Sequence, residues 1–475
     1  MRVRRDIPSF LQPLHTDEFA ARPPSDETTA AVRRTRALGE DAARRLGEET
    51  FWLDRQGTAA GLIAINEQHG AEFYDVPAAA VDDREAADDA LGGDEVVIDV
   101  QTHYVADRLR PATAEHTIEI YRNAMPSWWK GLDDLTSFNF AEYLRCVFLE
   151  TENAVAVLSS APGVGEHRQL YNGEMLATRV LLDELGARGR LLNHSVVDPT
   201  RLEDLSMMDR WADECRPVAW KVYTLGEVVT DSSAYSPDLT WREKMPGLWT
   251  SGWMLDDDDR GAQFLQRVDE LAGRGGPRII CAHKGLSGLV DTGSPRDIGP
   301  AAAAFPDLRF VVYHSGYEIA PDEEGPYTEE TADVGTNRMV STLRDNHIGP
   351  GANVYAELGS TWFVASSRPR EAAHILGKML LAVGEDNVLW GTDSIWYGPS
   401  QSLIDSFRAF QIPVEMQEEF GYPAITDEVK DKILSRNAAR LYGIDLEVAR
   451  RNAENDDLVW MRGALEYYRD KGSPR

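Results

Sequence analysis

Residues 388–393 read Val388-Leu389-Trp390-Gly391-Thr392-Asp393, a short apolar run that ends in glycine, threonine and aspartate. Short apolar and β-branched runs bounded by turn residues are typical of buried strands. Seven similar runs precede this one, and longer helical stretches lie between them. Strands that alternate with helices predict βα units on a parallel sheet. The expected strands are 96–100, 154–158, 190–197, 218–223, 278–282, 309–313, 353–358 and 387–390, and the expected helices between them include 173–186, 201–214, 259–273, 330–345 and 370–383.

Eight such units in a row fit an α/β fold of the closed (β/α)8 TIM-barrel type better than an open sheet. An open doubly wound sheet usually carries a glycine-rich phosphate turn after its first strand, and this sequence has none there. We therefore expect a barrel catalytic domain at residues 94–445. A mostly helical N-terminal extension at 1–93 and a helical C-terminal tail at 446–475 complete the expected organisation.

The composition indicates a globular protein that acts on small molecules. Hydrophobic residues make up 43% of the 475 positions and include 12 tryptophans, which is enough to bury a large core. The formal net charge is −30. Because so acidic a surface repels phosphate backbones and anionic lipids, we expect neither nucleic acid nor a membrane as partner.

The cysteines and the apolar runs favour a cytoplasmic location. Cys146, Cys215 and Cys281 are widely spaced, which indicates reduced thiols rather than a disulfide framework. No apolar run approaches the roughly 20 residues that a membrane-spanning helix needs. The nearest, residues 57–65, is short and follows the acidic stretch 48–54, so we interpret it as retained sequence that can descend from a decayed export signal.

The residues with chemical potential lie where the expected strands end, which is where (β/α)8 barrels place their active sites. Three histidines and one aspartate are among them. Imidazole and carboxylate groups are what a catalytic Zn, Mn or Fe ion takes, with one position left for water. A further histidine or aspartate can then transfer a proton. The strand-end residues are Gln101, His103, Lys221, His283, Lys284, His314, Glu357 and Asp393.

These stretches resemble the amidohydrolase superfamily, specifically the amidohydrolase-2 branch that includes aminocarboxymuconate-semialdehyde decarboxylase. The resemblance covers roughly residues 94–445. Its most specific part is the stretch 388–393 followed by residues 432–443, Lys-Ile-Leu-Ser-Arg-Asn-Ala-Ala-Arg-Leu-Tyr-Gly. The Ala-His-Lys-Gly sequence at 282–285 and the His-Ser-Gly sequence at 314–316 add to it because they come in the family's order.

The resemblance implies that His103, His283 and Asp393 bind one divalent metal ion, with zinc as first choice and manganese or iron as alternatives. At the position of His314 the family has either a residue that supports the metal or a general acid/base, and we favour the second role. Asp393 is a second candidate for the proton transfer. The resemblance also implies a homo-oligomer, most simply a homodimer.

The sequence departs from the family at Gln101. The family's first strand usually ends His-x-His, whereas this chain reads Gln101-Thr102-His103. A glutamine oxygen is a neutral and weaker ligand, although it could bind a harder ion or hydrogen-bond the water on the metal. Gln101 therefore stays in the expected metal set, and tight zinc binding is open to question.

Three further strand-end residues are expected to face the substrate. Lys221 stands near the position of a lysine carbamate that bridges two metals in binuclear members, but we favour contact with a substrate carboxylate. Glu357 is either a buried partner of Lys221 or an active-site base. Lys284 is the third candidate. The tryptophans at 128, 129, 241–253 and 362 could line an apolar substrate pocket or belong to the core.

Three functions remain open. The first is a hydrolase in which metal-activated water attacks an amide, lactone or ester carbonyl of a small molecule. The alternative is a non-oxidative decarboxylase of an aromatic or unsaturated carboxylate, which a basic clamp of Lys221, Lys284 or Arg338 facing the metal would favour. The second alternative is a metal-free binding protein, for which the motive is Gln101. Fold alone does not choose among them.

Overall fold

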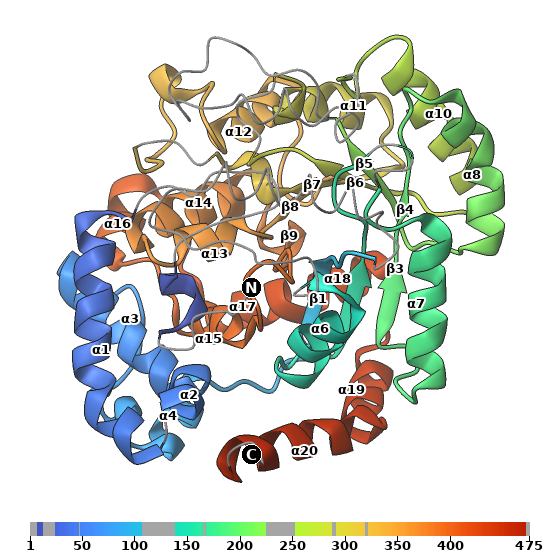
Figure 1. Ribbon diagram of the computed structural model, residues 1–475. Helices are drawn as coiled ribbons and strands as arrows, with labels where there is room; N and C mark the ends of the chain where they lie inside the picture. Colours follow the sequence, from blue (N-terminus) through green and yellow to red (C-terminus); the bar gives the residue numbers. More distant parts are fainter. Residues whose placement is uncertain are drawn as a thin grey trace.

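The computed structural model describes residues 7–12, 24–46, 48–106, 138–163, 165, 168–224, 252–286, 291–318 and 322–471. Its centre is a set of parallel strands surrounded by helices (Figure 1). In chain order the strands are β1 (Ile98–Thr102), β2 (Val155–Leu158), β3 (Leu191–Asn193), β4 (Ser195–Val196), β5 (Trp220–Tyr223), β6 (Ile279–His283), β7 (Arg309–Tyr313), β8 (Val354–Glu357) and β9 (Val388–Leu389).

The strands run in the order β1-β2-β3 and β4-β5-β6-β7-β8-β9, and backbone hydrogen bonds join the two groups at both ends. β3 and β4 are two halves of one strand, because the His194 amide between them still donates to the Leu158 carbonyl of β2 (3.0 Å). At the other seam the Val100 amide of β1 donates to the Trp390 carbonyl that follows β9 (3.1 Å). The ring therefore has eight strands, and the predicted (β/α)8 barrel is confirmed.

Helices cover the outside of the ring (Figure 1). Four of the five expected helices lie within two residues of their predicted bounds. The fifth, expected at 330–345, begins only at Asn337, because Gly335 before it adopts a left-handed φ of 53°. The helices that follow β1 are α6 (Phe140–Leu144), α7 (Asn172–Glu184), α8 (Leu202–Glu214), α10 (Arg260–Ala272), α11 (Ile298–Ala304), α12 (Asn337–Asp345), α13 (Thr361–Ala365), α14 (Pro369–Ala382), α15 (Gln401–Ala409), α16 (Val414–Phe420), α17 (Asp427–Asp431) and α18 (Asn437–Tyr442).

Helix α10 shows why these segments pack as they do. Phe264, Leu265, Val268 and Leu271 recur at helical spacing and are buried, so one apolar face of the helix covers the strands. The interior of the ring forms a separate apolar cluster, which includes Val100, Val157 and Val311.

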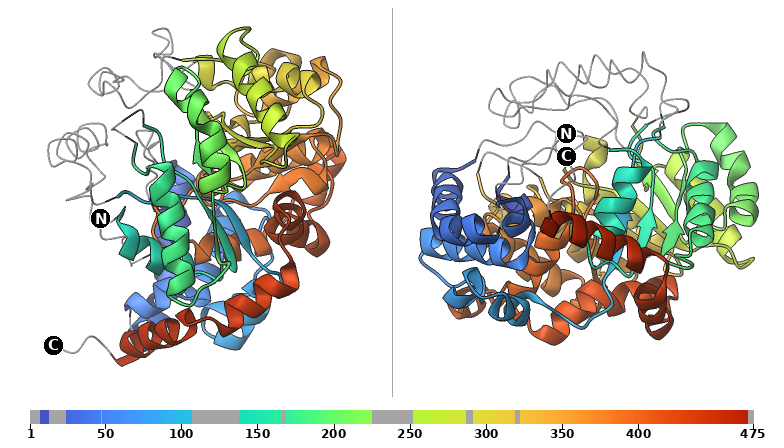
Figure 2. Two further views of the ribbon diagram at one scale, coloured as in Figure 1. Left: turned by 90° about the vertical axis from the view of Figure 1, so that its right-hand side faces the viewer. Right: turned by 60° about the horizontal axis from the view of Figure 1, so that its bottom comes forward.

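The helices before β1 are α1 (Asp26–Leu46), α2 (Glu48–Leu53), α3 (Arg55–His69) and α4 (Arg84–Leu91), and they lie together on one flank of the barrel beside α15 (Figures 1 and 2). The apolar run 57–65 is the buried part of α3. Arg55 ties this block to the barrel through ion pairs with Glu152 and Asp405. Among the described residues, no helix combines the length and the apolar character needed to cross a bilayer.

The chain continues beyond α18 as α19 (Leu446–Asn455) and α20 (Leu458–Lys471). Arg190, just before β3, is buried and ion-paired with Asp456 between these two helices, so the tail is attached to the barrel by a charge-assisted bond. The division into an extension at 1–93, a catalytic domain at 94–445 and a tail at 446–475 stays a prediction.

Candidate metal centre

The carboxyl ends of β1, β6, β7 and β9 bring four predicted site residues together. His103, His283, His314 and Asp393 are all buried. His103 Nε2 lies 3.0 Å from Asp393 Oδ1, and His283 Nδ1 lies 3.2 Å from His314 Nε2. Residues separated by up to 290 positions (Asp393 minus His103) therefore share one cluster at the predicted edge of the barrel.

The orientation of His103 is fixed by the backbone of the neighbouring strand. Its Nδ1 donates to the carbonyl oxygen of Ser159, at the end of β2, over 3.0 Å. The proton is then on Nδ1, and Nε2 presents a lone pair. That lone pair faces a carboxylate oxygen of Asp393, so two acceptors lie in contact and require a cation or a proton between them. Among the described residues, however, no three histidine, cysteine, aspartate or glutamate side chains are arranged to hold a metal ion.

His314 is oriented in the same way from the other side of the cluster. Its Nδ1 donates to the carbonyl oxygen of Gly359 (2.6 Å), which leaves Nε2 to face His283. The two rings meet edge to face, with centroids 4.5 Å apart. Burial lowers the pKa of both imidazoles well below the ordinary value, and each also feels nearby positive charge. Both histidines are therefore neutral and can donate a lone pair.

Asp393 is the charged member of the cluster. Burial raises the pKa of its carboxyl, but a proton on His103 Nε2, 3.0 Å away, would hold the pKa below the ordinary value. Asp393 also accepts a hydrogen bond from Ser360 on its second oxygen, Oδ2 (2.5 Å).

The backbone at this edge is strained where the site residues stand. His314, Ser315, Ser360 and Asp393 have φ between 53° and 65°, a region that costs a non-glycine residue about 1–3 kcal/mol. Glu357 holds two of these turns, because its carboxylate accepts from the amides of His314 (3.1 Å) and Gly359 (2.7 Å). Burial raises the pKa of Glu357 to about 8. Glu357 therefore binds the backbone of the site rather than facing outward.

Two glycines make room for this arrangement. A Cβ on Gly359 would overlap Gln101 Oε1, and a Cβ on Gly391 would overlap Glu357 Oε1. Any larger residue at either position would displace Gln101 or Glu357.

Gln101 is inside the cluster, but its amide nitrogen, and not its oxygen, faces the histidines and Asp393. Nε2 donates to Asp393 Oδ1 (2.8 Å) and lies 3.4 Å from His103 Nε2 and 3.5 Å from His314 Nε2. Within the described part of the chain its oxygen Oε1 has no hydrogen-bond partner. The expectation that the oxygen of Gln101 is a metal ligand therefore does not match this geometry, in which Gln101 is a donor to the carboxylate.

Lys284 does not face the cluster, contrary to the expectation that it contacts substrate. It is fully buried, and its Nζ donates to Asp297 Oδ2 (2.6 Å) and to the carbonyl oxygen of Thr292 (2.8 Å). Burial lowers the pKa of Lys284 and raises that of Asp297, while the attraction between them opposes both shifts. Lys284 follows His283 directly, so the two side chains leave the strand on opposite sides.

The other two basic residues expected near the substrate, Arg338 and Lys221, have different partners. Arg338 forms ion pairs with Glu318 and, over 3.0 Å, with Asp333. Lys221 is buried in the barrel, and its Nζ lies 3.6 Å from the ring centroid of Tyr313 and 4.7 Å from that of Tyr223. Lys221 therefore stands below the cluster on two aromatic faces.

The tryptophans lie in the core, beside the histidine cluster and in segments outside the described residues. Trp362 packs on Phe407 and Phe410 and is core, and Trp253 packs on Phe264. Trp396 lies near the cluster, with its ring stacked on His103 at a centroid distance of 6.3 Å. The tryptophans at 128, 129, 241 and 249 lie outside the described residues.

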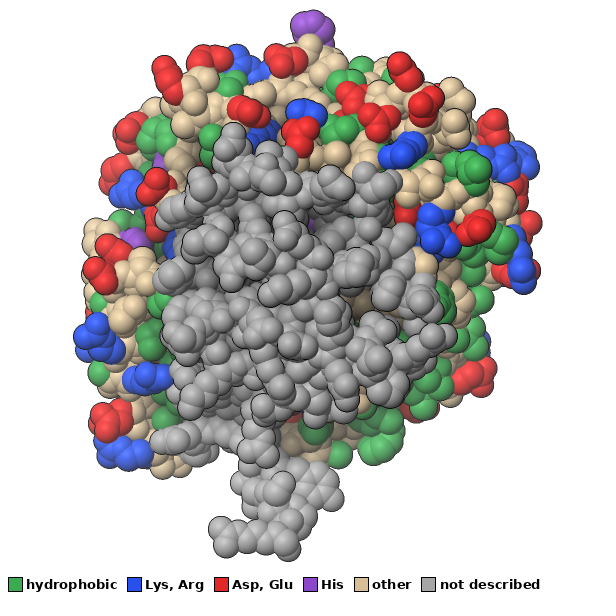
Figure 3. Space-filling view, turned by 45° about the horizontal axis from the view of Figure 1, so that its top comes forward, with side chains coloured by type: hydrophobic (Ala, Val, Ile, Leu, Met, Phe, Trp, Pro, Cys, Tyr) green, Lys and Arg blue, Asp and Glu red, His purple; other side chains and the backbone are tan. Residues whose placement is uncertain are grey.

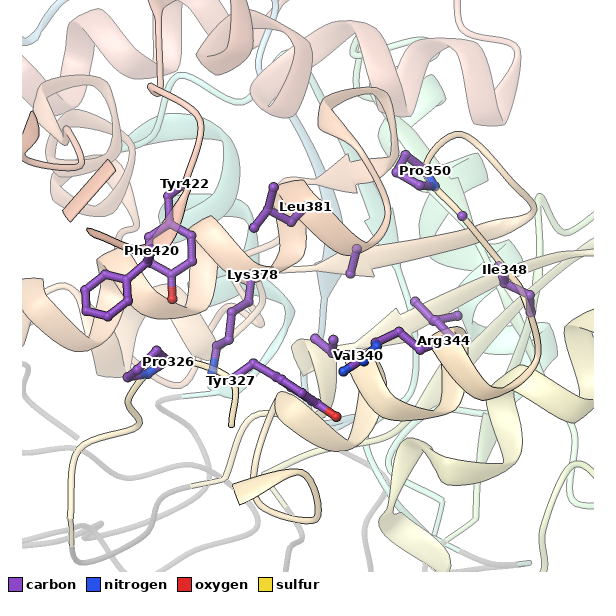
Figure 4. A pocket seen from close by; sticks show the side chains of 13 residues that line it. Pro326, Tyr327, Val340, Arg344, Ile348, Pro350, Lys378, Leu381, Phe420 and Tyr422 are labelled. Carbon is purple, nitrogen blue, oxygen red and sulfur yellow. The ribbon is translucent and has the colours of Figure 1, made fainter. Parts of the chain in front are cut away.

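A cavity of about 440 Å³ lies elsewhere, in the helical layer between α12 and α14 (Figure 4). Its walls include Tyr327, Phe420 and Tyr422. Lys378 at its side already donates to Glu324 (2.5 Å), to Asn337 (2.7 Å) and to the carbonyl oxygen of Gly325. The cavity is separate from the histidine cluster. On the described part of the face in Figure 3, acidic and basic side chains are interspersed.

Sequence reasoning missed two residues near Asp393. Ser360 donates a hydrogen bond to Asp393, and Tyr397 is hydrogen-bonded to Ser360. It also missed Asp297, the partner of Lys284. Of these three residues only Asp297 could have been anticipated from the sequence, because a buried lysine such as Lys284 implies a carboxylate nearby.

Several solved structures are similar to this chain. One is a 2,6-dihydroxybenzoate decarboxylase from Rhizobium, at 14% identity over 74% of this chain and all (100%) of that one, with a TM-score of 0.39. Another is a protein from Pseudomonas putida described as a 2-pyrone-4,6-dicarboxylic acid hydrolase, at 13% identity, the same coverage and a TM-score of 0.39. A third is a dihydroxybenzoic acid decarboxylase from Polaromonas with bound manganese, at 14% identity over 74% and 98% of the two chains, with a TM-score of 0.39. The fold assignment rests on the strand pairing and not on these likenesses.

No curated protein matches the chain significantly. Residues 253–444 match the family model described as amidohydrolase, and this region spans β6 to β9 with His283, His314 and Asp393. The part of the chain that carries β6 to β9 is thus similar to the amidohydrolase family.

Proposed function

We propose that the chain is a metal-dependent hydrolase that acts on an amide, lactone or ester carbonyl of a small molecule. The observation that carries this proposal is the contact of His103 Nε2 with Asp393 Oδ1, since the Nδ1 proton of His103 is already committed to Ser159. Two buried acceptors in contact need a cation or a proton between them, and we propose the cation because the family match lies on the half of the barrel that carries Asp393.

His103, His283 and Asp393 are the residues that we propose to hold one divalent ion. Zinc is the first choice for nitrogen and carboxylate donors, with manganese or iron as alternatives. Manganese has support in the Polaromonas decarboxylase, whose structure contains it. When bound, such an ion polarises a carbonyl and makes water acidic enough to ionise near pH 7.

His314 is the residue that we propose to move the proton. Its ring is held through Nδ1 by Gly359, so Nε2 is the one ring atom that can take or return a proton in the site. Glu357 supports this role indirectly because it holds the His314 amide. Asp393 is the alternative proton carrier, although its Oδ1 already contacts His103 and Gln101.

The charges around the cluster favour hydrolysis over decarboxylation. A carboxylate substrate needs a basic group, but Lys284 is paired with Asp297 and Arg338 with Glu318. The decarboxylase stays as the alternative because Lys221 lies below the cluster, where a substrate carboxylate could meet its ammonium group. The donation from Gln101 to Asp393 supports the remaining alternative, a binding protein without metal.

We also propose that the protein is a cytoplasmic homodimer. Cys146, Cys215 and Cys281 are buried and form no disulfide bond, which suits a reducing compartment. The dimer rests on the family resemblance, and a mass near 53 kDa by light scattering would contradict it.

The test is metal content per chain, measured by plasma mass spectrometry on wild type, His283→Ala and a control, His347→Asn, at an exposed histidine. About one equivalent in wild type and control, lost in His283→Ala, supports the metal site. Panels of lactones, esters and amides, and of aromatic carboxylates with detection of CO2, then separate the two reactions. If the chain holds no metal after reconstitution with zinc, manganese and iron, the metal-dependent enzyme is excluded and the metal-free binding protein is the remaining hypothesis.

A further inference from the structure

The cavity between α12 and α14 lies outside the histidine cluster, and most of its wall is apolar (Figure 4). Its volume of about 440 Å³ is within the roughly 300–1,000 Å³ that small-molecule sites occupy. Val340 and Leu343 of α12, Leu381 of α14 and the ring of Phe420 line it. Leu381 is 50% exposed, so this apolar wall is open to solvent. An open apolar concavity of this size is typical of a binding site rather than of a packed core.

Lys378 lies at the side of the cavity, but its charge is balanced within the chain. Its ammonium group donates to Glu324 (2.5 Å), to Asn337 (2.7 Å) and to the carbonyl oxygen of Gly325 (2.9 Å). These three bonds use all three protons of the group. Lys378 is only 3% exposed, and the carboxylate of Glu324 offsets its charge. Lys378 is therefore bound to the protein rather than directed to a ligand.

The two phenol groups of the cavity are also hydrogen-bonded to the protein. The hydroxyl of Tyr422 lies 3.0 Å from Nδ1 of His374, and the hydroxyl of Tyr327 lies 3.3 Å from Oγ of Ser341. A ligand rich in hydroxyl groups, such as a sugar, would bury them against an apolar wall, where each unpaired polar group costs free energy. The wall therefore favours a ligand made of hydrocarbon rings, which can pack on the aromatic side chains.

Arg344 is the cation of the cavity that a ligand can reach. Its side chain is 57% exposed, and its guanidinium group lies 4.9 Å from the ring centroid of Tyr327. Its ion pair with Glu329 spans 3.5 Å between two exposed groups, and such pairs contribute little to stability. The guanidinium can therefore exchange Glu329 for the acid group of a ligand at small cost. Figure 4 shows Arg344 and Tyr422 on opposite sides of the cavity.

We propose that this cavity is a second binding site, which takes a small molecule with apolar rings and one acid group. The rings pack on Tyr327, Leu381 and Phe420, and Arg344 binds the carboxylate or sulfonate. The net charge of −30 repels anions from the chain as a whole, so an anion that binds must meet a local cation. The inference goes beyond the proposed function, because neither a metal ion nor the reaction takes part in it.

The experiment is a fluorescence titration of the full chain with two probes that share the same rings. Anilinonaphthalene sulfonate carries an acid group, and phenylnaphthylamine is its neutral counterpart. The variants are Arg344→Gln, which removes the cation, and Leu381→Asp, which places a charge on the apolar wall. Their controls are Arg210→Gln and Val180→Asp, because Arg210 in α8 is 63% exposed and Val180 in α7 is 48% exposed. Circular dichroism and the melting temperature establish that each variant is folded.

We expect Arg344→Gln to bind the sulfonate about tenfold more weakly, at the low end of what a hydrogen bond to a charged group contributes, because Arg344 is half exposed. Its affinity for the neutral probe should equal that of wild type. Leu381→Asp should weaken the binding of both probes by at least about tenfold, since the rings lose an apolar contact. Both controls should bind the probes like wild type, and Arg344→Gln carries the test if Leu381→Asp does not fold.

Two results would overturn the inference. The first is the absence of saturable binding of either probe to wild type. The second is a wild-type affinity for the sulfonate in Arg344→Gln or in Leu381→Asp, which would place the probe elsewhere on the chain. Neither result bears on the proposed function, because the titration requires neither metal nor activity. A failure of the metal measurements on the histidine cluster would likewise leave this binding unchanged.

Discussion

The ring of His103 connects three strand ends, since its Nδ1 donates to the Ser159 carbonyl after β2 and its Nε2 lies 3.0 Å from Asp393 Oδ1 after β9. One imidazole is thus positioned by backbone that belongs to other strands. In the proposed metal site its lone pair would be aimed before an ion binds, and such preorganisation would lower the cost of binding. The family resemblance names His103 as a ligand, and this geometry supplies a physical reason for the choice.

A stability measurement checks the role of His103. Zinc at 100 times its dissociation constant should stabilise wild type by about 2.7 kcal/mol, because it binds only the folded chain. His103→Ala should show no zinc-dependent rise in melting temperature, and the exposed-site variant His347→Asn should respond like wild type. A full response in His103→Ala would mean that other residues bind the ion.

Substitution of Gln101 by histidine should strengthen metal binding. In the present chain Nε2 of Gln101 is a neutral donor to Asp393, whereas an imidazole there would present a lone pair beside His103. We expect Gln101→His to lower the zinc dissociation constant at least about tenfold, equivalent to about 1.4 kcal/mol. Competition with a chromophoric chelator measures it. An unchanged dissociation constant would show that Gln101 does not weaken zinc binding and that a histidine at this position adds no ligand.

Gly359 should tolerate no side chain. A Cβ there would overlap Gln101 Oε1 and crowd the carboxylate of Glu357, so Gly359→Ala should displace both and weaken metal binding by at least about tenfold. Gly173→Ala is the matched control, because Gly173 lies in helix α7 with nothing near the added carbon, and alanine there should stabilise the chain by about 0.5–1 kcal/mol. Chelator competition and thermal melting report the two effects.

The sequence predicts the barrel and the position of the site because both follow from strand periodicity. The apolar runs mark where strands are buried, and parallel strands bring their carboxyl ends together. His103, His283 and Asp393 therefore lie at the same end of the barrel, and their role as metal ligands stays a prediction. The direction of Lys284 was also predictable in principle, since it follows His283 and neighbouring strand residues point to opposite sides.

The partners of Asp393 were not predictable in the same way. Ser360 reaches Oδ2 only because its backbone adopts a left-handed φ, which no periodic pattern signals in a residue other than glycine. The donation from Gln101 to Asp393, rather than ligation through its oxygen, depends likewise on how the loops after β8 and β9 turn. Turn conformation, not strand pattern, decides these contacts.

Loss of one partner of the buried Lys284–Asp297 ion pair should destabilise the fold more than loss of both partners. Lys284→Met leaves a buried carboxylate with one backbone donor, Leu255, and should cost about 3–5 kcal/mol in the free energy of unfolding. The double variant Lys284→Met, Asp297→Leu removes both charges and should recover most of this loss. Urea denaturation of the two single variants and the double variant measures the coupling. Additive losses would mean that the two charges do not stabilise each other.

The stability of the helical layer should depend on pH through His374 in α14. Burial first, then the charges of Lys378 and Arg370 on the same helix, lower the pKa of His374 to about 4, and Tyr422 across from it contributes a neutral hydroxyl at 3.0 Å.

In the unfolded chain the pKa of a histidine is about 6.5, so between pH 6.5 and pH 4 the unfolded state binds more protons. The contribution of His374 is thus complete above pH 6.5 and is lost as the pH falls towards 4, with a slope of up to about 1.4 kcal/mol per pH unit. Unfolding by urea at several pH values should show this slope in wild type, and His374→Gln should reduce it by about one proton. Equal slopes in the two proteins would assign the acid sensitivity to other groups.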